Sequence, residues 1–144
     1  MTLPIRSLTL SLLQHRYAIL RLAPDSPVPA WASAGDFFSI TRTSDELSIV
    51  CPAENILATQ LPDAVWHAIK VHGPFAFEEI GILASLTTPL ATAKIGIFVI
   101  STFDTDYLLV QSKDIRNAIA TLQSTGHSFI NTDINTGDSK ESDA

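Results

Sequence analysis

The chain has 144 residues and a formal net charge of −6, and 46% of its residues are hydrophobic. This length suffices for one compact domain or for two small ones that share a core. The acidic balance argues against nucleic acid and anionic membrane surfaces as partners, because either contact needs a basic stripe and the nine Lys and Arg residues are scattered.

The single cysteine, Cys51, ends an apolar run that starts at Leu47. One Cys cannot form a disulfide within the chain, which favours a reducing compartment. The N-terminus lacks the pattern of a signal peptide, and no apolar run has the length needed to span a bilayer. We therefore expect a cytoplasmic protein in which Cys51 is a small buried hydrophobic residue rather than a catalytic thiol.

The first half of the chain has the pattern of strands rather than helices. Residues 7–13 alternate between polar and apolar side chains, and residues 17–23 form a second apolar segment. The polar residues 14–16 between them predict a hairpin turn. Prolines at positions 24, 27 and 29 then interrupt regular structure, and Pro29 favours a short helical turn over 29–33.

A second hairpin is the clearest signal in this half. Residues 37–42 predict one strand and residues 47–51 the returning strand, with Ser44, Asp45 and Glu46 as the turn between them. The first half is therefore expected to be rich in strands and poor in helix.

The second half predicts a different order of elements. These elements are a strand at 64–71, a helix from Glu78 that Pro89 should kink, strands at 96–100 and 107–110, a helix at 113–125 capped by Ser112, and a strand at 127–130. This βαββαβ order is the ferredoxin-like arrangement, an antiparallel sheet with helices on one face. Residues 131–144 are polar and predict a disordered tail.

A polar turn, residues 101–106, separates two of these apolar strands. It carries two carboxylates, three hydroxyls and Phe103. Such a turn can hold a small ligand with a positive charge, for example the α-amino group of an amino acid. It can also be a solvated hairpin tip, since Asp and Thr are ordinary turn residues, and this second interpretation is the stronger one for Asp104.

Three blocks of the second half form a distinctive pattern, namely Glu79-Ile80-Gly81-Ile82-Leu83-Ala84, Pro89-Leu90-Ala91 and residues 100–110. With these blocks the second half resembles the ACT domains of the CASTOR type, which include the cytosolic arginine sensors of animals and two-ACT relatives in bacteria and fungi. A weaker match, mostly a pattern of strands, extends over the first half through residues 18–22 and 46–51. The resemblance covers residues 8–130.

This resemblance implies an α+β fold of two tandem ferredoxin-like (βαββαβ) ACT modules, each an antiparallel sheet with helices on one face. The modules would occupy residues 1–62 and 63–130, followed by the tail at 131–144. It further implies a sensor or regulatory subunit that binds a small molecule, usually an amino acid, at an interface between ACT units. Because the animal sensors carry four ACT units and this chain has room for two, we expect a homodimer.

The resemblance also implies which residues bind the ligand. They are Glu79 and Gly81 at the helix start, Thr102, Phe103 and Asp106 in the turn, and Gly96 and Ile97 acting from a partnering ACT unit. Elementary chemistry agrees with part of this set. The N–H groups of a helix start can hold a carboxylate, a glycine lets a ligand approach the backbone, and Asp106 can pair with an ammonium or guanidinium group.

Two other functions stay open from the sequence. Glu79 and Asp106 could converge on one pocket and perform acid–base chemistry, as in an isomerase or cyclase built on an ACT scaffold. Alternatively, the protein could have only a structural or interaction role. We expect no metal and no cofactor, because the four His residues and Cys51 lack metal-ligand spacing. His67 is interpreted as a packed histidine and His72 as a turn residue.

Overall fold

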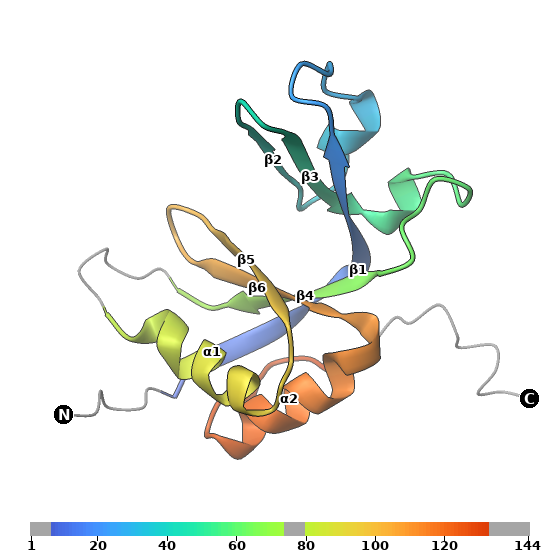
Figure 1. The fold of residues 1–144 in the computed structure, drawn as a ribbon. Coiled ribbons are helices and arrows are strands. Elements are labelled where there is room, and N and C mark those ends of the chain that lie inside the picture. Colours follow the sequence, from blue (N-terminus) through green and yellow to red (C-terminus); the bar gives the residue numbers. More distant parts are fainter. Residues whose placement is uncertain (1–6, 74–79, 133–144) are drawn as a thin grey trace, which may run out of the picture. The chain divides into compact units, whose positions relative to one another are not determined.

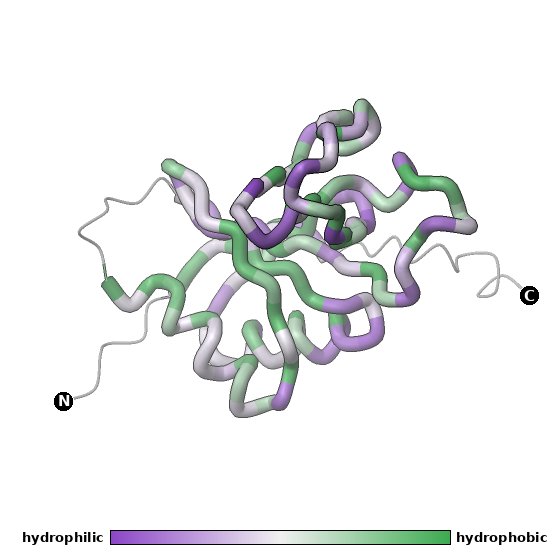
Figure 2. Tube along the Cα trace, turned by 45° about the horizontal axis from the view of Figure 1, so that its top comes forward, coloured by the Kyte–Doolittle hydropathy of each residue, from purple (hydrophilic) through white to green (hydrophobic). Residues whose placement is uncertain are grey.

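The computed structural model describes residues 7–73 and 80–132 (Figure 1). The chain folds into two compact units. Among the described residues, unit 1 holds 7–14, 67–73 and 80–132, and unit 2 holds 15–66. Strand β1 (Thr9–Leu22) begins in unit 1 and ends in unit 2. Hydrophobic residues occur along the strands and helices of both units (Figure 2).

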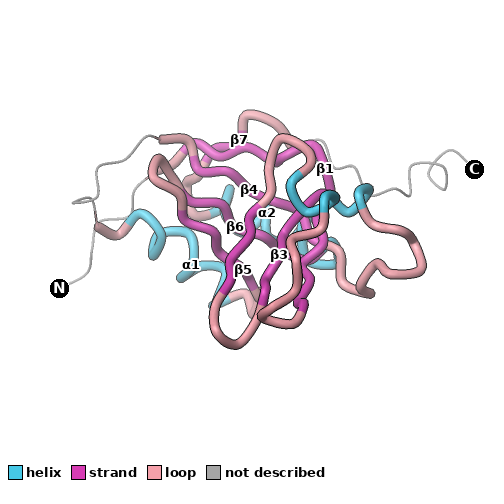
Figure 3. Tube along the Cα trace, turned by 90° about the horizontal axis from the view of Figure 1, so that it is seen from above, coloured by secondary structure: helices cyan, strands magenta, loops and turns pink. Residues whose placement is uncertain are grey.

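Unit 1 has the predicted βαββαβ order after β1. Its elements are β4 (Trp66–Val71), α1 (Ile82–Thr92), β5 (Ile97–Ser101), β6 (Asp106–Gln111), a 3-10 turn η3 (Ser112–Asp114), α2 (Ile115–Ser124) and β7 (Ser128–Phe129). In its sheet the strand order is β1-β4-β6-β5, and β7 pairs with β1 in parallel. Helices α1 and α2 lie together on one face of this sheet (Figures 1 and 3). The α+β class is thereby confirmed for this half.

The core of unit 1 lies between the sheet and the two helices. Every second strand residue points into it, and the helices contribute side chains at a spacing of three or four. The strand residues are Leu8, Leu10, Leu12, Ile69, Val71, Leu108 and Val110, and the helix residues are Ile82, Leu86, Leu90, Ile115, Ala118, Ile119 and Leu122. The start of the chain therefore belongs to this core, which differs from the expected division at residue 62.

Helix α1 continues through Pro89, which the sequence predicted to kink it. A proline removes the hydrogen bond to the carbonyl four residues earlier, here that of Ser85. The ring Nε2 of His127 lies 3.0 Å from this oxygen, and His127 is buried with 4% of its surface exposed. His127 thus supplies the hydrogen bond that Pro89 cannot make.

Helix α2 differs from its predicted form at its start. Residues 112–114 form the 3-10 turn η3, and Ser112 makes no capping hydrogen bond. Its hydroxyl is buried and has no partner in the described part of the chain. The prediction of a Ser112 cap is therefore wrong, because Ser112 is the first residue of η3 and Asp114 occupies the N-cap position of α2.

Unit 2 contains the second part of β1, β2 (Ser39–Arg42) and β3 (Leu47–Pro52), with 3-10 turns η1 (Ala30–Ser33) and η2 (Ala53–Asn55). Strand β3 pairs antiparallel with both β1 and β2. The predicted hairpin at residues 14–16 is wrong, because β1 is continuous there. This triplet has no Gly, Pro or Asn to force a turn, and the strand simply passes from one unit to the other.

Residues 15–66 contain no α-helix, so unit 2 does not form the second βαββαβ module that was expected. The long connection between β1 and β2 holds three prolines, which leave room only for the turn η1. Arg42 fastens this connection by donating hydrogen bonds to the main-chain oxygens of Pro24 and Ser26. The small core of the unit is formed by Ala18, Ala32, Leu47, Ile49, Cys51, Ala53 and Ile56.

Candidate functional site

One end of unit 1 brings together the end of β4, the turn between β5 and β6, and the start of α1 (Figures 1 and 3). The turn of the β5–β6 hairpin is Thr102–Thr105, and α1 is the next helix after β4 in the sequence. Thr105 is 8% exposed, and its Oγ1 donates a hydrogen bond to the main-chain oxygen of Val71 at 2.5 Å. This bond fixes the turn against the end of β4.

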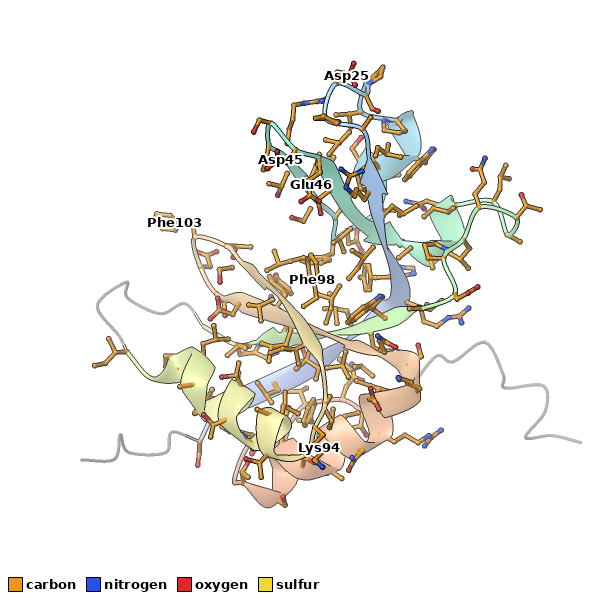
Figure 4. The ribbon with its side chains drawn as sticks, viewed as in Figure 1. Asp25, Asp45, Glu46, Lys94, Phe98 and Phe103 are labelled. Atoms are coloured by element: carbon orange, nitrogen blue, oxygen red, sulfur yellow. The ribbon has the colours of Figure 1, made fainter. Side chains whose placement is uncertain are left out.

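The turn is also ordered from within. Thr102 Oγ1 accepts a hydrogen bond from the Thr105 N–H at 3.2 Å and donates one to the Thr105 carbonyl at 3.0 Å. Ser101 Oγ donates to Asp106 Oδ1 at 2.5 Å, so the carboxylate is held in one orientation. Phe103 stands at the tip with 80% of its surface exposed (Figure 4). The turn therefore presents a fixed carboxylate and an accessible aromatic ring.

A small pocket lies beside this turn. Its volume is about 170 Å³, and it is lined by Lys70, His72, Gly73, Asp104 and Thr105. We call it the β4-end pocket. The His72 ring is held in place, since its Nε2 lies 2.9 Å from Ser11 Oγ.

Sequence reasoning interpreted His72 and Asp104 as turn residues and did not consider Lys70. The pattern that could have indicated Lys70 and His72 is a Lys and a His two positions apart at the end of a strand. Such residues point to one face of the sheet, next to a polar turn.

The remaining predicted site residues are distributed as follows. Gly81 adopts φ 83° immediately before α1, a left-handed conformation that favours glycine. Glu79 lies outside the described residues. Gly96 and Ile97 are at the opposite end of β5 from Thr102, about 16 Å away at roughly 3.3 Å per strand residue. The structure thus brings Thr102, Phe103 and Asp106 together and leaves Gly96 and Ile97 apart from them within one chain.

The other chemically notable residues lie away from this end. Cys51 is fully buried, and burial raises the pKa of its thiol to about 11, which disfavours the reactive thiolate. Within residues 7–73 and 80–132, no three His, Cys, Asp or Glu side chains come together so that they could hold a metal ion. None of the helices in this part of the chain has the length and hydrophobicity of a bilayer-spanning helix.

Known protein families match both halves of the chain. A family model described as ACT domain matches residues 63–124, and a second model, for an N-terminal domain, matches residues 15–59. A protein of Agobacterium tumefaciens with a solved crystal structure is 44% identical, has a TM-score of 0.79, and is matched over 90% of this chain and 97% of its own. A protein of unknown function from Vibrio cholerae, 21% identical with a TM-score of 0.67, shares the fold.

Curated relatives give the family a more specific character. The chain is 35% identical over 109 residues to the human protein "Cytosolic arginine sensor for mTORC1 subunit 1", and equally to that of Pongo abelii. The match covers 70% of this chain and 32% of each relative, so the chain spans about a third of their length. The chain therefore belongs to the ACT-domain family, among the proteins of the CASTOR type.

Proposed function

We propose that the protein is a cytoplasmic amino-acid-binding protein that acts as a sensor or regulatory subunit. The observation that carries this proposal is the ordered β5–β6 turn, in which Ser101 holds the Asp106 carboxylate and the ring of Phe103 is exposed. A fixed carboxylate suits an ammonium or guanidinium group, and an accessible aromatic face suits the apolar or cationic part of a ligand. The names of the relatives, which are arginine sensors, agree with a ligand of this class.

The proposed ligand lies at an interface between ACT units. The residues expected to contact it fall into two groups, Thr102, Phe103 and Asp106 at one end of β5 and Gly96 and Ile97 at the other. These groups are about 16 Å apart along the strand, farther than one amino acid can bridge. A homodimer supports simultaneous contact, because the turn of one copy can face the β5 start of its partner.

The proposed mechanism is thermodynamic linkage. A ligand held by two copies binds one arrangement of the dimer better than another and shifts the population toward it. The shift cannot exceed the difference in binding free energy between the two arrangements. The dimer arrangement would then report the ligand concentration to a partner protein.

A thermal-unfolding screen with each standard L-amino acid tests the proposal. A true ligand at roughly 100 times its Kd stabilises the folded state by about 2.7 kcal/mol, which is a clear increase in Tm. Asp106→Asn should remove this increase. Asp45→Asn is the matched control, because Asp45 is an exposed turn carboxylate in unit 2, and it should keep the increase.

Two results would contradict the proposal. One is a screen in which no amino acid raises Tm, and the other is a ligand response that Asp106→Asn leaves unchanged. Sedimentation velocity with and without the ligand tests the interface separately. A strict monomer in both conditions would rule out the site between two copies while leaving amino-acid binding itself in place.

A further inference from the structure

Two opposite charges line the β4-end pocket without pairing. Lys70 comes from β4 and Asp104 from the β5–β6 turn, so the two charges stand on different walls. Within the described residues, neither side chain makes a hydrogen bond or an ion pair. The Lys70 ammonium and the Asp104 carboxylate can therefore both form hydrogen bonds with a molecule that enters the pocket.

The β4-end pocket lies on one face of the sheet, and the Asp106 side chain lies on the opposite face, which the helices cover. Ile69 and Val71 point into the core beneath the helices, so Lys70 and His72 point to the other face. The hydrogen bond from His72 to Ser11 agrees, since Leu10 and Leu12 on either side of Ser11 are core residues. Asp106 has the parity of the core residues Leu108 and Val110 and so lies on the helix face.

The walls of the pocket are held at a fixed separation. Thr105 ties the turn to β4 through Val71, and Ser11 fixes the His72 ring. Gly73 contributes no side chain that could fill the entrance. A cavity needs only about 15 Å³ to hold one water molecule, so about 170 Å³ holds several waters or a compact metabolite.

The charges define the class of that metabolite. A simple anion would be repelled by Asp104, and a simple cation by Lys70. A compact molecule with one charge of each sign satisfies both walls by charge-assisted hydrogen bonds. The head group of an α-amino acid is such a molecule, because its carboxylate and its ammonium group are separated by one carbon atom.

We propose that the β4-end pocket is a second ligand site, distinct from the Asp106 site, that takes the zwitterionic head group of an amino acid. The carboxylate binds to Lys70, with the His72 ring beside it, and the ammonium group binds to Asp104. This site does not need a partner copy, since all of its lining residues belong to unit 1. The protein would accordingly bind amino acids at two places on the same end of one unit.

The test follows backbone amide signals in ¹⁵N-¹H NMR spectra. The Asp106→Asn protein is used, so that the first proposed site is disabled. Each standard L-amino acid is titrated first, followed by the amide and the deaminated acid of the strongest binder. We expect the amino acid to shift the amides of His72, Gly73 and Thr105, and to bind about tenfold more tightly than either analogue, because each analogue lacks one charge.

Two variants assign the charges. Lys70→Met should remove the preference over the amide, and Asp104→Asn should remove the preference over the deaminated acid. Lys113→Met is the control, because Lys113 is exposed and lies away from the pocket, and it should change neither preference. The spectra themselves show whether each variant is folded.

The proposal is overturned if no amino acid shifts these amides, or if both preferences survive in Lys70→Met and Asp104→Asn. Either result would leave the pocket as a solvated surface feature. The fate of the Asp106 proposal is decided separately, by the thermal screen on the unmodified protein. An amino acid that needs Asp106 but does not shift the amides of His72, Gly73 and Thr105 would support the first site and refute the second.

Discussion

Thr105 Oγ1 donates a hydrogen bond to the main-chain oxygen of Val71, and this bond joins the β5–β6 turn to the end of β4 across 34 residues of sequence. Thr105→Val keeps the shape of the side chain and removes the donor. We expect a loss of about 1–2 kcal/mol in the free energy of unfolding, because a buried hydrogen bond is lost. Urea denaturation measures it.

The control for this prediction is Thr41→Val. Thr41 is exposed on β2, so the same replacement should change the free energy of unfolding by less than about 0.5 kcal/mol. Equal losses at the two positions would show that the Thr105–Val71 hydrogen bond does not contribute to the free energy of unfolding.

His127 and Pro89 form a second relationship that can be tested. The Leu8 N–H donates to His127 Nδ1 at 3.1 Å, so Nδ1 carries no proton and Nε2 carries the proton that is donated to the Ser85 oxygen. His127→Leu should cost at least about 2 kcal/mol, because it leaves the buried Leu8 N–H and the part-buried Ser85 oxygen without the partner they have in His127. The ¹⁵N shifts of the ring should report the Nε2–H tautomer in the unmodified protein.

A double-mutant cycle isolates the part played by Pro89. Pro89→Ala restores an N–H that can donate to the Ser85 oxygen, so it should recover stability in the His127→Leu background. In the unmodified background the gain should be smaller, because His127 already occupies that oxygen. Equal gains in both backgrounds would refute the coupling between the two residues.

Glycine should be the favoured residue just after each of the two helices, because the backbone has a positive φ at both positions. Lys94 follows α1 at φ 62°, and Gly126 follows α2 at φ 101°. Lys94→Gly should stabilise the protein by about 0.5–1 kcal/mol, because glycine adopts a positive φ without steric cost. Gly126→Lys should destabilise it by a similar amount. Thermal unfolding measures both changes, and the same sign in both variants would contradict the explanation.

The raised pKa of the Cys51 thiol should lower the free energy of unfolding at alkaline pH. Burial raises the pKa of its thiol from 9.0 in the unfolded chain to about 11 in the folded protein. Its contribution to stability is therefore complete below pH 9.0 and is lost as the pH rises toward about 11, a loss of about 2 kcal/mol. Urea denaturation of the unmodified protein and of Cys51→Ala across this range measures it. The two curves should converge as the pH rises, and parallel curves would refute the assignment.

The sequence predicted the second half of the fold well because its signals are local. The apolar runs on either side of residues 101–106 predicted β5, the turn and β6, and the spacing of Ile115, Ala118, Ile119 and Leu122 predicted α2. The first half was harder. Alternation of apolar residues cannot distinguish two paired strands from one long strand, so β1 was predicted as a hairpin.

The site was predictable only where its residues are neighbours in sequence. Thr102, Phe103 and Asp106 share one turn and were found together. The β4-end pocket was missed because Lys70 and Asp104 come from separate segments, which a long-range hydrogen bond between Thr105 and Val71 holds side by side. No local pattern encodes such a bond. The contact between His127 and the Ser85 oxygen was missed for the same reason, since 42 residues separate the two.

Strand β1 determines the order in which the protein can fold during synthesis. Unit 2 is one continuous stretch, residues 15–66 in the described part of the chain, and can form as soon as it leaves the ribosome. Unit 1 must wait, because Leu8, Leu10 and Leu12 at its beginning pack with residues made more than a hundred positions later, and β7 pairs directly with β1. Strand β1, which precedes the other described strands in the sequence, is thus among the last to be fully paired.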